Sequence, residues 1–382
     1  MEIQWREYEI GELLSYEQPT PYIVSSTDYN DKYKTPVLTA GKSFILGYTN
    51  ETQGVYTALP AIIFDDFTTA SQYVNFEFKV KSSAMKILTP NTELVLPKFI
   101  YYRMQIIQFD HSTHKRYWIQ QYSKIKVSIP PIPVQEQIVA RIEELFSELD
   151  NGVETLRKTK QQLAVYRQAV LKAVFGESTQ DGYRPLRTVL SSSPQNGLYK
   201  PKTAYGSGTR ILRIDGFYDG RISGDYDFKR LHLSEPEIKQ YQLNKWDLVI
   251  NRVNSMPYLG KCVLVRDLAE VTVYESNMMR MRLDENIVDP EYVTHYLSSF
   301  IGRKELTKNA KQAVNQASIN QTDVGNALIP VPESLEEQRM VVSEINARMS
   351  VCDSIEKTVD TALQQAEAMR QSILKQAFEG KL

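Results

Sequence analysis

The sequence predicts an α+β protein in which two mixed α/β globular heads are separated by two long antiparallel α-helices that form a coiled-coil spacer. Three observations lead to this fold class. The 382 residues exceed what one core usually holds. Two stretches with a seven-residue apolar repeat lie 203 residues apart, and the segment before each shows strand and turn patterns. We therefore expect a pseudo-two-fold internal repeat with head 1 at 1–128, spacer helix 1 at 129–178, head 2 at 179–328 and spacer helix 2 at 329–382.

Head 1 is expected to place strands before a helix. The runs VYTALPAIIFDDF (55–67) and YVNFEFKV (73–80) are rich in β-branched and aromatic residues, which is typical of strands. The run LPKFIYYRMQIIQF (96–109) begins with a proline near its first turn and is typical of a helix. A polar stretch then leads to a proline-rich segment at 129–133.

Spacer helix 1 starts at these prolines and contains no further one. An apolar residue recurs at every seventh position, at Ile142, Leu149, Leu156, Leu163 and Val170. Such a stripe indicates a helix that packs along its length against another helix. Asn151 and Gly152 interrupt the pattern and would bend the helix at modest cost.

Head 2 repeats the order of head 1. The runs 209–214, 245–253 and 259–265 are typical of strands. They are followed by DPEYVTHYLSSFIGRKEL (289–306), for which we expect one helix with Asp289 as its N-cap.

Spacer helix 2 carries the stripe of helix 1 in smaller residues, at Ile345, Cys352, Val359, Ala366 and Ile373. Its proline-rich entry also recurs, and Glu136-Gln137 corresponds to Glu337-Gln338 if two extra residues precede the common register. The exit RQ-x-[VI]-L-K-x-x-F is shared by 167–175 and 370–378. If the two stripes face each other, helix 2 must run back antiparallel and pack small residues against large ones.

Composition excludes several classes of protein. The sequence contains no run of about 18 apolar residues, so no membrane span is expected. The charged start MEIQWREYEI lacks the apolar region of a signal peptide. Two cysteines, Cys262 and Cys352, are too few for a disulfide framework or a four-ligand zinc site. We expect a cytoplasmic protein.

Charge and aromatic residues are unevenly distributed. The net charge is −1, but head 2 carries 20 basic and 17 acidic residues whereas spacer helix 2 carries 6 and 9. Of 23 tyrosines only Tyr166 lies in a spacer helix. The polar stretches 111–124 and 308–323 occupy the same place in the two heads, just before a helix entry. Amide side chains there can pair with adenine, Arg or Lys with guanine, and the remaining hydroxyl groups and cations with phosphate.

A third polar stretch, 250–261, follows a strand, and its counterpart in head 1 is either 39–50 or 65–73. These stretches predict DNA contacts. The candidate residues are Lys32, Lys34, Lys42, Ser43, Tyr48, Thr68, Thr69, Ser71, Gln72, His111, His114, Lys115, Arg116, Trp118, Gln120, Gln121, Asn251, Arg252, Asn254, Ser255, Tyr258, Lys261, Lys308, Lys311, Gln312, Asn315, Gln316, Ser318 and Asn320.

Catalytic motifs are imitated but incomplete. Gly41-Lys42-Ser43 lacks the first glycine of a phosphate-binding loop. The segment 289–292 has Glu291 where amino-methyltransferases have a second proline, and no cofactor loop accompanies it. His111 and His114 have ligand-like spacing without a third ligand. We expect no catalytic residues, no metal and no enzyme activity in this chain.

The doubled IPxPxxxEQ entries at 129–137 and 329–338, the doubled exits and the two-head layout resemble the specificity subunits of type I restriction–modification systems over the whole chain. The resemblance implies that each head is a target-recognition domain reading one half of a bipartite, asymmetric sequence in double-stranded DNA. It implies that the helices set the gap and dock two modification (methyltransferase) subunits, which restriction (translocase and nuclease) subunits join. S-adenosylmethionine, ATP and Mg²⁺ are then expected in the partners and no cofactor in this chain.

Two other functions remain open at this point. One is a self-contained DNA methyltransferase fused to a recognition domain. The other is a coiled-coil scaffold whose two heads bind proteins. The near-neutral charge departs from that of a lone DNA-binding protein, so weak DNA binding is expected without partner subunits.

Overall fold

The structure is a computed structural model that describes residues 5–41, 43–111, 116–176, 182–218, 220–222 and 226–382. The chain divides into two compact units. Unit 1 consists of Met1–Arg157 with Asp360–Leu382, and unit 2 of Lys158–Val359. Each unit therefore contains one head and one part of each long helix. The α+β fold class is confirmed, whereas the division into four segments stays a prediction.

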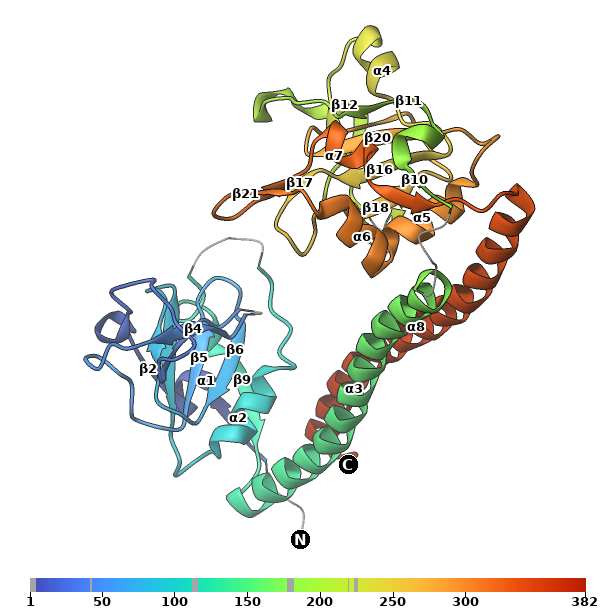
Figure 1. Ribbon diagram of the computed structural model, residues 1–382. Coiled ribbons are helices and arrows are strands. Elements are labelled where there is room, and N and C mark those ends of the chain that lie inside the picture. Colours follow the sequence, from blue (N-terminus) through green and yellow to red (C-terminus); the bar gives the residue numbers. More distant parts are fainter. Residues whose placement is uncertain (1–4, 42, 112–115, 177–181, 219, 223–225) are drawn as a thin grey trace. The chain divides into compact units, whose positions relative to one another are not determined.

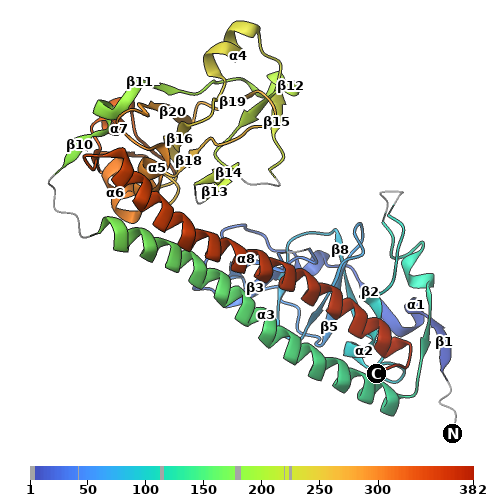
Figure 2. The same cartoon turned by 90° about the vertical axis from the view of Figure 1, so that its right-hand side faces the viewer.

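The two long helices are α3 (Ile132–Phe175) and α8 (Leu335–Phe378), each of 44 residues. They lie side by side in both views (Figures 1 and 2). In unit 1 Asp150 of α3 pairs with Arg370 of α8, and in unit 2 Arg167 of α3 pairs with Asp353 of α8. Residue numbers rise along one helix while they fall along the other, so the helices are antiparallel, as predicted. α3 continues through Asn151 and Gly152 without a break.

The head in unit 1 is built on a four-stranded antiparallel sheet in the order β2-β8-β5-β6, beside a three-stranded sheet β4-β3-β7. The elements are β1 (Arg6–Glu9), α1 (Ile10–Leu13), β2 (Leu14–Glu17), β3 (Thr35–Leu38), β4 (Ile45–Thr49), β5 (Ala61–Asp65), β6 (Ser71–Val74), β7 (Lys79–Val80), β8 (Met85–Pro90), α2 (Pro97–Met104) and β9 (Lys126–Ile129). β1 pairs with β9 and brings the chain to the start of α3.

The head in unit 2 repeats this topology with a four-stranded sheet β11-β20-β16-β18 and a three-stranded sheet β15-β12-β19. Its elements are β10 (Tyr183–Pro185), β11 (Leu190–Asn196), β12 (Tyr205–Leu212), β13 (Phe217–Tyr218), β14 (Arg221–Ile222), β15 (Lys229–Leu231), α4 (Glu235–Tyr241), β16 (Asp247–Asn251), β17 (Val253–Asn254), β18 (Cys262–Leu264), β19 (Thr272–Tyr274), β20 (Met278–Leu283), α5 (Pro290–Ser298), α6 (Phe300–Thr307), β21 (Lys311–Gln312), β22 (Ala317–Ser318), α7 (Gln321–Gly325) and β23 (Leu328–Pro330).

The two heads share one plan strand by strand. In each, the first strand of the three-stranded sheet pairs antiparallel with the second and parallel with the third, as β3 does with β4 and β7, and β12 with β15 and β19. In each, a two-stranded pair leads into a long helix: β1 with β9 before α3, and β10 with β23 before α8. The four-stranded sheets also correspond, in the orders β2-β8-β5-β6 and β11-β20-β16-β18. Strand β5 therefore matches β16, and β6 matches β18.

The repeated helix exit packs each head onto its helix pair. Phe175 at the end of α3 lies edge-on to Tyr292 and Tyr296 of α5, with ring centroids 5.6 and 5.4 Å away. Phe378 at the end of α8 lies edge-on to Phe99 of α2, at 5.1 Å. The shared phenylalanine therefore joins the core of the head, which explains why both copies of the exit keep it.

The helix entries also repeat, in a register that differs from the predicted one. Gln135 and Gln338 are both completely buried. The side-chain oxygen of Gln135 accepts a hydrogen bond from Leu96 N at 2.8 Å, and that of Gln338 accepts one from Asp289 N at 2.8 Å. Gln338 thus corresponds to Gln135, 203 residues away, and not to the exposed Gln137. The predicted correspondence with two extra residues was wrong.

Two predicted elements are divided. The helix expected at 289–306 does begin after the cap Asp289, whose Oδ1 accepts from Glu291 N at 2.8 Å. It ends at Ser298, because Ser299 caps a new helix by accepting from Gly302 N at 3.1 Å. The strand expected at 73–80 is likewise two strands, β6 and β7, which belong to different sheets. Along the described part of the chain, no helix combines the length and apolarity that crossing a membrane would need.

Candidate nucleic-acid interface

In unit 1 a tight turn connects β5 to β6. Asp65 Oδ1 accepts hydrogen bonds from Phe67 N at 2.9 Å and Thr68 N at 2.8 Å, which closes the turn. Thr69 adopts the left-handed conformation with φ of 58°, which is rare for a β-branched residue. The turn thereby holds a phenylalanine and two threonines at the end of the central sheet.

His111 joins this turn to the second polar stretch of head 1. Its Nε2 lies 2.9 Å from Thr69 Oγ1 and 2.9 Å from the carbonyl oxygen of Thr68. The guanidinium carbon of Arg116 lies 5.9 Å from the centroid of the Phe67 ring, and Phe67 is 43% exposed. Two stretches that the sequence singled out separately, 65–73 and 111–124, therefore meet. We call Phe67, Thr68, Thr69, His111 and Arg116 the head 1 patch.

A buried ion pair holds the base of this patch. Asp66 and Lys86 are 2% and 1% exposed, with 3.6 Å between carboxylate and ammonium. Asp66 Oδ1 also accepts from Trp118 N at 2.8 Å, and its carbonyl oxygen accepts from Tyr117 N at 2.9 Å. The pair thus ties the turn to the segment that follows Arg116. Neither Asp66 nor Lys86 was predicted, because nothing in the sequence marks a charge as buried.

Other candidates of head 1 have different places. Trp118 is 1% exposed and packs against Phe64 and Tyr122, so its prediction as a DNA contact is corrected: its ring belongs to the core. Ser71 is buried too, and its hydroxyl accepts from Gln105 Nε2 at 2.8 Å. Tyr48 and Gln72 are half-buried, and the exposed candidates outside the patch are Lys32, Lys34, Ser43, Gln120 and Gln121. Lys42, His114 and Lys115 lie outside the described residues.

In unit 2 the polar stretches form a small sheet in the order β17-β22-β21. Ser318 pairs with Val253 on one side and with Lys311 on the other. The sheet therefore joins 250–261 to 308–323, which the sequence had also singled out separately. β21 and β22 are the arms of a hairpin, visible at one side of the head in Figure 1. We call residues 311–318 the head 2 hairpin.

The hairpin presents mostly polar, uncharged and basic groups. Its turn is closed by a hydrogen bond of 2.7 Å from Ala313 N to the carbonyl oxygen of Gln316. The side chains around the turn are exposed, at Lys311, Gln312, Asn315 and Gln316. Residues 306–322 contain no acidic side chain. Val314 is 99% exposed, the most exposed large apolar side chain among the described residues.

The loop that follows β17, residues 255–261, continues directly from this sheet. Tyr258 is 45% exposed, and Lys261 Nζ lies 4.5 Å from the centroid of its ring. Asn251 is 1% exposed and its amide Nδ2 donates to the Tyr258 carbonyl at 3.5 Å, so it supports the loop from below. Asn251 is therefore corrected from a DNA contact to an internal residue. Arg252, which is half-buried, donates from Nη1 to the Ser276 carbonyl at 2.9 Å.

The remaining candidates of head 2 serve local structure. Asn320 caps α7 by accepting from Thr322 N at 2.8 Å and Asp323 N at 2.9 Å. Asn254 Oδ1 accepts from Ser255 N at 2.8 Å, and Lys308 pairs with Glu305. These contacts fix the backbone on both sides of the hairpin.

The topology decides which part of head 1 corresponds to 250–261. Because β5 matches β16 and β6 matches β18, the β5–β6 turn matches the connection between β16 and β18. The counterpart is therefore 65–73, not 39–50. Both heads place their candidate surface at the same end of the central sheet, as a short turn in unit 1 and as a longer loop with a hairpin in unit 2.

Each unit also has a cavity where its head meets α3 and α8. In unit 2 the cavity is about 510 Å³ and in unit 1 about 550 Å³. Arg167 and Asp353 line the first, and Arg370 and Asp150 line the second. Arg370 lies 203 residues after Arg167, and Asp353 lies 203 residues after Asp150. The two cavities therefore occupy equivalent positions of the repeat.

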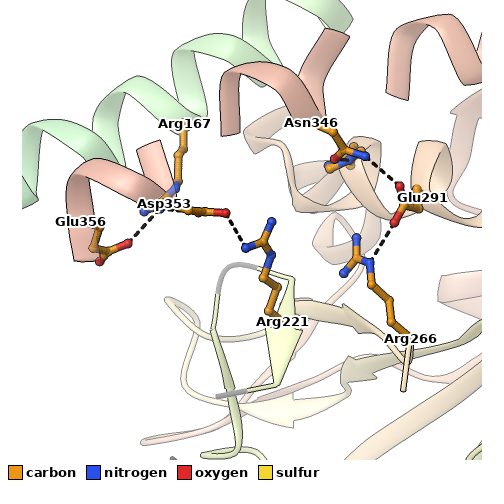
Figure 3. Close-up of polar contacts among 8 residues, drawn as sticks. Arg167, Arg221, Arg266, Glu291, Asn346, Asp353 and Glu356 are labelled. Carbon is orange, nitrogen blue, oxygen red and sulfur yellow. Dashed lines mark hydrogen bonds and ion pairs between the residues drawn. The ribbon is translucent and has the colours of Figure 1, made fainter. Parts of the chain in front are cut away.

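Ion pairs attach head 2 to the helices of unit 2 (Figure 3). Arg167 donates to Asp353 at 2.9 Å and Glu356 at 2.8 Å, and Asp353 also pairs with Arg221 at the start of β14. Burial would lower the pKa of Arg167, but its hydrogen bonds to Glu356 and Asp353 raise it.

A second contact in Figure 3 joins α5 to α8. Glu291 accepts from Arg266 Nε and from Asn346 Nδ2, both at 2.8 Å. Burial would raise the pKa of Glu291, but these two hydrogen bonds and the charge of Arg266 hold that pKa below its ordinary range. His295 Nε2 lies 3.0 Å from Asn346 Oδ1, and burial lowers the pKa of His295.

Comparisons with known proteins agree with this geometry. Residues 2–163 match the family model described as "Type I restriction modification DNA specificity domain". The chain is 32% identical over 363 residues to the Type I restriction enzyme EcoR124I/EcoR124II specificity subunit of Escherichia coli, covering 89% of this chain and 85% of the relative. It is 29% identical over 274 residues to the EcoKI specificity subunit of Escherichia coli K12, covering 68% of this chain and 58% of that relative.

The fold has a counterpart among solved structures. A chain solved in work on complex assembly and conformational transition of the type I R-M system superposes with a TM-score of 0.66. The two chains are 18% identical, and the superposition covers 100% of each. At 18% identity this match supports the fold alone.

Proposed function

This chain belongs to the family of type I restriction enzyme specificity subunits, and from that membership we propose that its two heads each read one half of a bipartite DNA target. The observation that carries the proposal is the equivalent placement of two polar surfaces. The head 1 patch and the head 2 hairpin follow matching strands of the two central sheets. A bipartite target needs two reading surfaces held by one repeated framework, and this arrangement supplies them.

The two surfaces differ in chemistry, so the target is asymmetric. The head 1 patch combines two threonines, a histidine and an arginine beside an exposed phenylalanine. The head 2 hairpin offers amides, a lysine and a valine, with Tyr258 and Lys261 in the neighbouring loop. Arginine and lysine favour guanine, amides favour adenine, and hydroxyl groups accept either base or phosphate partners.

The helices fix the gap between the half-sites and dock two copies of a modification (methyltransferase) subunit. A helix of 44 residues is about 66 Å long at ~1.5 Å per residue. Exposed apolar residues support docking: Val165 and Tyr166 of α3 are 70% and 50% exposed, and Met369 of α8, which is equivalent to Tyr166, is 54% exposed. Equivalent positions on a repeated helix pair suit two copies of one partner.

The chain is the non-catalytic subunit of such an enzyme. Methyl transfer from S-adenosylmethionine, ATP hydrolysis with Mg²⁺ and DNA cleavage are assigned to the modification and restriction subunits. In this proposal no residue of the head 1 patch or the head 2 hairpin has a catalytic role, because reading a base edge requires only hydrogen bonds and apolar contact.

A head exchange tests the proposal. Residues 1–128 are replaced by the corresponding head of another specificity subunit, and the chimaera is expressed with the methyltransferase subunit. Sequencing of methylated genomic DNA then gives the modified target. We expect one half-site to change while the other half-site and the gap persist. A target altered in both halves, or in neither, contradicts the proposal, and the purified chain alone should transfer no methyl groups.

A further inference from the structure

The head 2 hairpin has an apolar tip surrounded by polar side chains. Val314 is 99% exposed, whereas its neighbours in the hairpin are amides, a lysine and alanines. A branched aliphatic side chain that contacts almost nothing in its own fold contributes little to folding stability through burial. The sheet that carries it is nevertheless well defined, with Ser318 paired on both sides.

The surroundings of Val314 suit a DNA groove better than an apolar partner surface. Residues 306–322 contain two lysines and no acidic side chain, and apart from the small Ala313 the other exposed side chains of the hairpin are hydrogen-bonding groups. A two-stranded ribbon fits the major groove of B-DNA. On the base edges that line this groove, the 5-methyl group of thymine is the one apolar substituent.

Resting on the proposed function, we infer that Val314 contacts the 5-methyl group of a thymine in the half-site read by head 2. In this arrangement the flanking Gln312, Asn315 and Gln316 face the polar edges of neighbouring bases, and Lys311 faces the backbone phosphates. Val314 then adds specificity at one base pair by an apolar contact, which no hydrogen-bonding residue of the hairpin supplies.

The test removes the methyl group from the DNA and the side chain from the protein. The chain is purified in complex with its methyltransferase subunit, and its target is taken from the sequenced methylated DNA. Each thymine of the second half-site is replaced in turn by deoxyuridine, which lacks only the 5-methyl group. At one position the affinity of the unaltered complex should fall about fourfold, the value of roughly one buried methyl group.

Variants at the tip then locate the contact. Val314→Ala should lower affinity for the unmodified duplex by a similar factor and should no longer respond to deoxyuridine at that position. Val314→Thr, which exchanges one methyl group for a hydroxyl, should keep only part of the response. Val271→Ala is the matched control, since Val271 is 54% exposed on the same head outside the hairpin. It should leave affinity and the deoxyuridine response unchanged.

The outcomes separate this inference from the proposed function. Specific binding that shows no deoxyuridine response in the second half-site, or a response that survives in Val314→Ala, overturns the inference and leaves the proposed function standing. A Val314→Ala variant that loses methyltransferase subunit on size exclusion but binds DNA normally assigns the tip to a protein contact and also overturns it. Absence of any sequence-specific binding by the complex overturns the proposed function itself.

Discussion

Single buried amides fix the start of each spacer helix. Gln135 joins the entry of α3 to the residue before α2, and it also donates to the carbonyls of Leu94 at 3.0 Å and Pro130 at 2.8 Å. Replacing Gln135 by alanine leaves one N–H and two carbonyls without this partner in a dry site. We expect unit 1 to lose about 2–3 kcal/mol of unfolding free energy. Urea denaturation monitored by hydrogen exchange in α2 peptides would measure the loss.

The matched control for Gln135→Ala is Gln137→Ala, two residues on in the same helix. Gln137 is exposed, so its replacement should change stability by less than about 0.5 kcal/mol. Gln338→Ala should reproduce the loss in unit 2, because Gln338 bonds the residue before α5 in the same way. Equal effects of Gln135→Ala and Gln137→Ala would contradict the role assigned to the buried amide.

Residue chemistry alone predicted the surface residues of the heads better than the residues that support them. Thr68, Thr69 and His111 were singled out because hydroxyl and imidazole groups in polar stretches suggest contacts, and their contact with DNA stays a prediction. Trp118 was misplaced, because an aromatic ring beside cations fits either a stacking surface or a core. Only the tertiary contact with Asp66 shows that its segment folds inward. Val314 had a signal, since it and the buried Ile319 are the two large apolar residues in the polar stretch 308–323.

At the scale of elements, two helical glycines should respond oppositely to alanine. Gly152 lies within α3, and a Cβ added there meets no atom within 4 Å. Gly152→Ala should therefore stabilise α3 by about 0.5–1 kcal/mol. Gly302 lies in the first turn of α6, where a Cβ would collide with the carbonyl oxygen of Tyr296. Gly302→Ala should cost about 2 kcal/mol or more, because backbone must move.

Thermal unfolding of the two glycine variants, each compared with the unaltered chain, checks this pair. A stabilised Gly302→Ala would show that α5 and α6 can separate without cost. The close approach at Gly302 also explains why 289–306 is not one helix. The chain turns at Ser299 so that α6 starts against the end of α5, and local helix propensity gives no sign of this tertiary contact.

The contact between α5 and α8 should make unit 2 sensitive to acid. Burial lowers the pKa of His295 below its ordinary value of 6.5, with Arg266 and Arg221 adding to this effect and Glu291 opposing it. The unfolded chain then binds a proton that the folded chain does not. Stability is fully present above pH 6.5 and falls as the pH drops below it.

Glu291 extends the acid sensitivity to lower pH. Its folded pKa lies below the ordinary 4.5, so its contribution is lost as the pH falls from 4.5 through the folded pKa. Urea midpoints of unit 2 measured from pH 7.5 to 3 should decline in both windows. His295→Gln should flatten the upper window only. An unchanged slope near pH 6 in that variant would exclude His295 as the titrating group.

For the whole molecule, the repeat was the most predictable feature. The helix stripes and exits lie in one register of 203 residues, and the structure keeps that register from Gln135 to Phe175 and from Gln338 to Phe378. The equivalence of the sheets was not readable strand by strand, because strand order depends on pairings between segments far apart in sequence. It is the sheet topology that identified 65–73 as the counterpart of 250–261.

The folded repeat also links distant parts of the sequence, which gives a further prediction. Phe378 packs on Phe99, and Phe175 is buried against α5. Phe378→Ala should destabilise unit 1 by about 2 kcal/mol, and Phe175→Ala should destabilise unit 2 by about 3–5 kcal/mol. Hydrogen exchange in α2 and α5 peptides separates the two effects. Faster exchange in α5 after Phe378→Ala would contradict the assignment of these contacts.

The packing of Phe378 has a consequence for synthesis on the ribosome. The strands and α2 of unit 1 are made first, but the helical segment that covers Phe99 is made more than 200 residues later. Phe378 follows Ile129, the last residue of β9, by 249 residues, so at typical elongation rates of 5–20 residues per second the first head waits about 12–50 s with that apolar face uncovered. Unit 2, by contrast, is contiguous in sequence and can close as soon as its last residue emerges. The nascent first head is therefore the stage at which this chain most needs protection from aggregation, and the second head can be complete before the first.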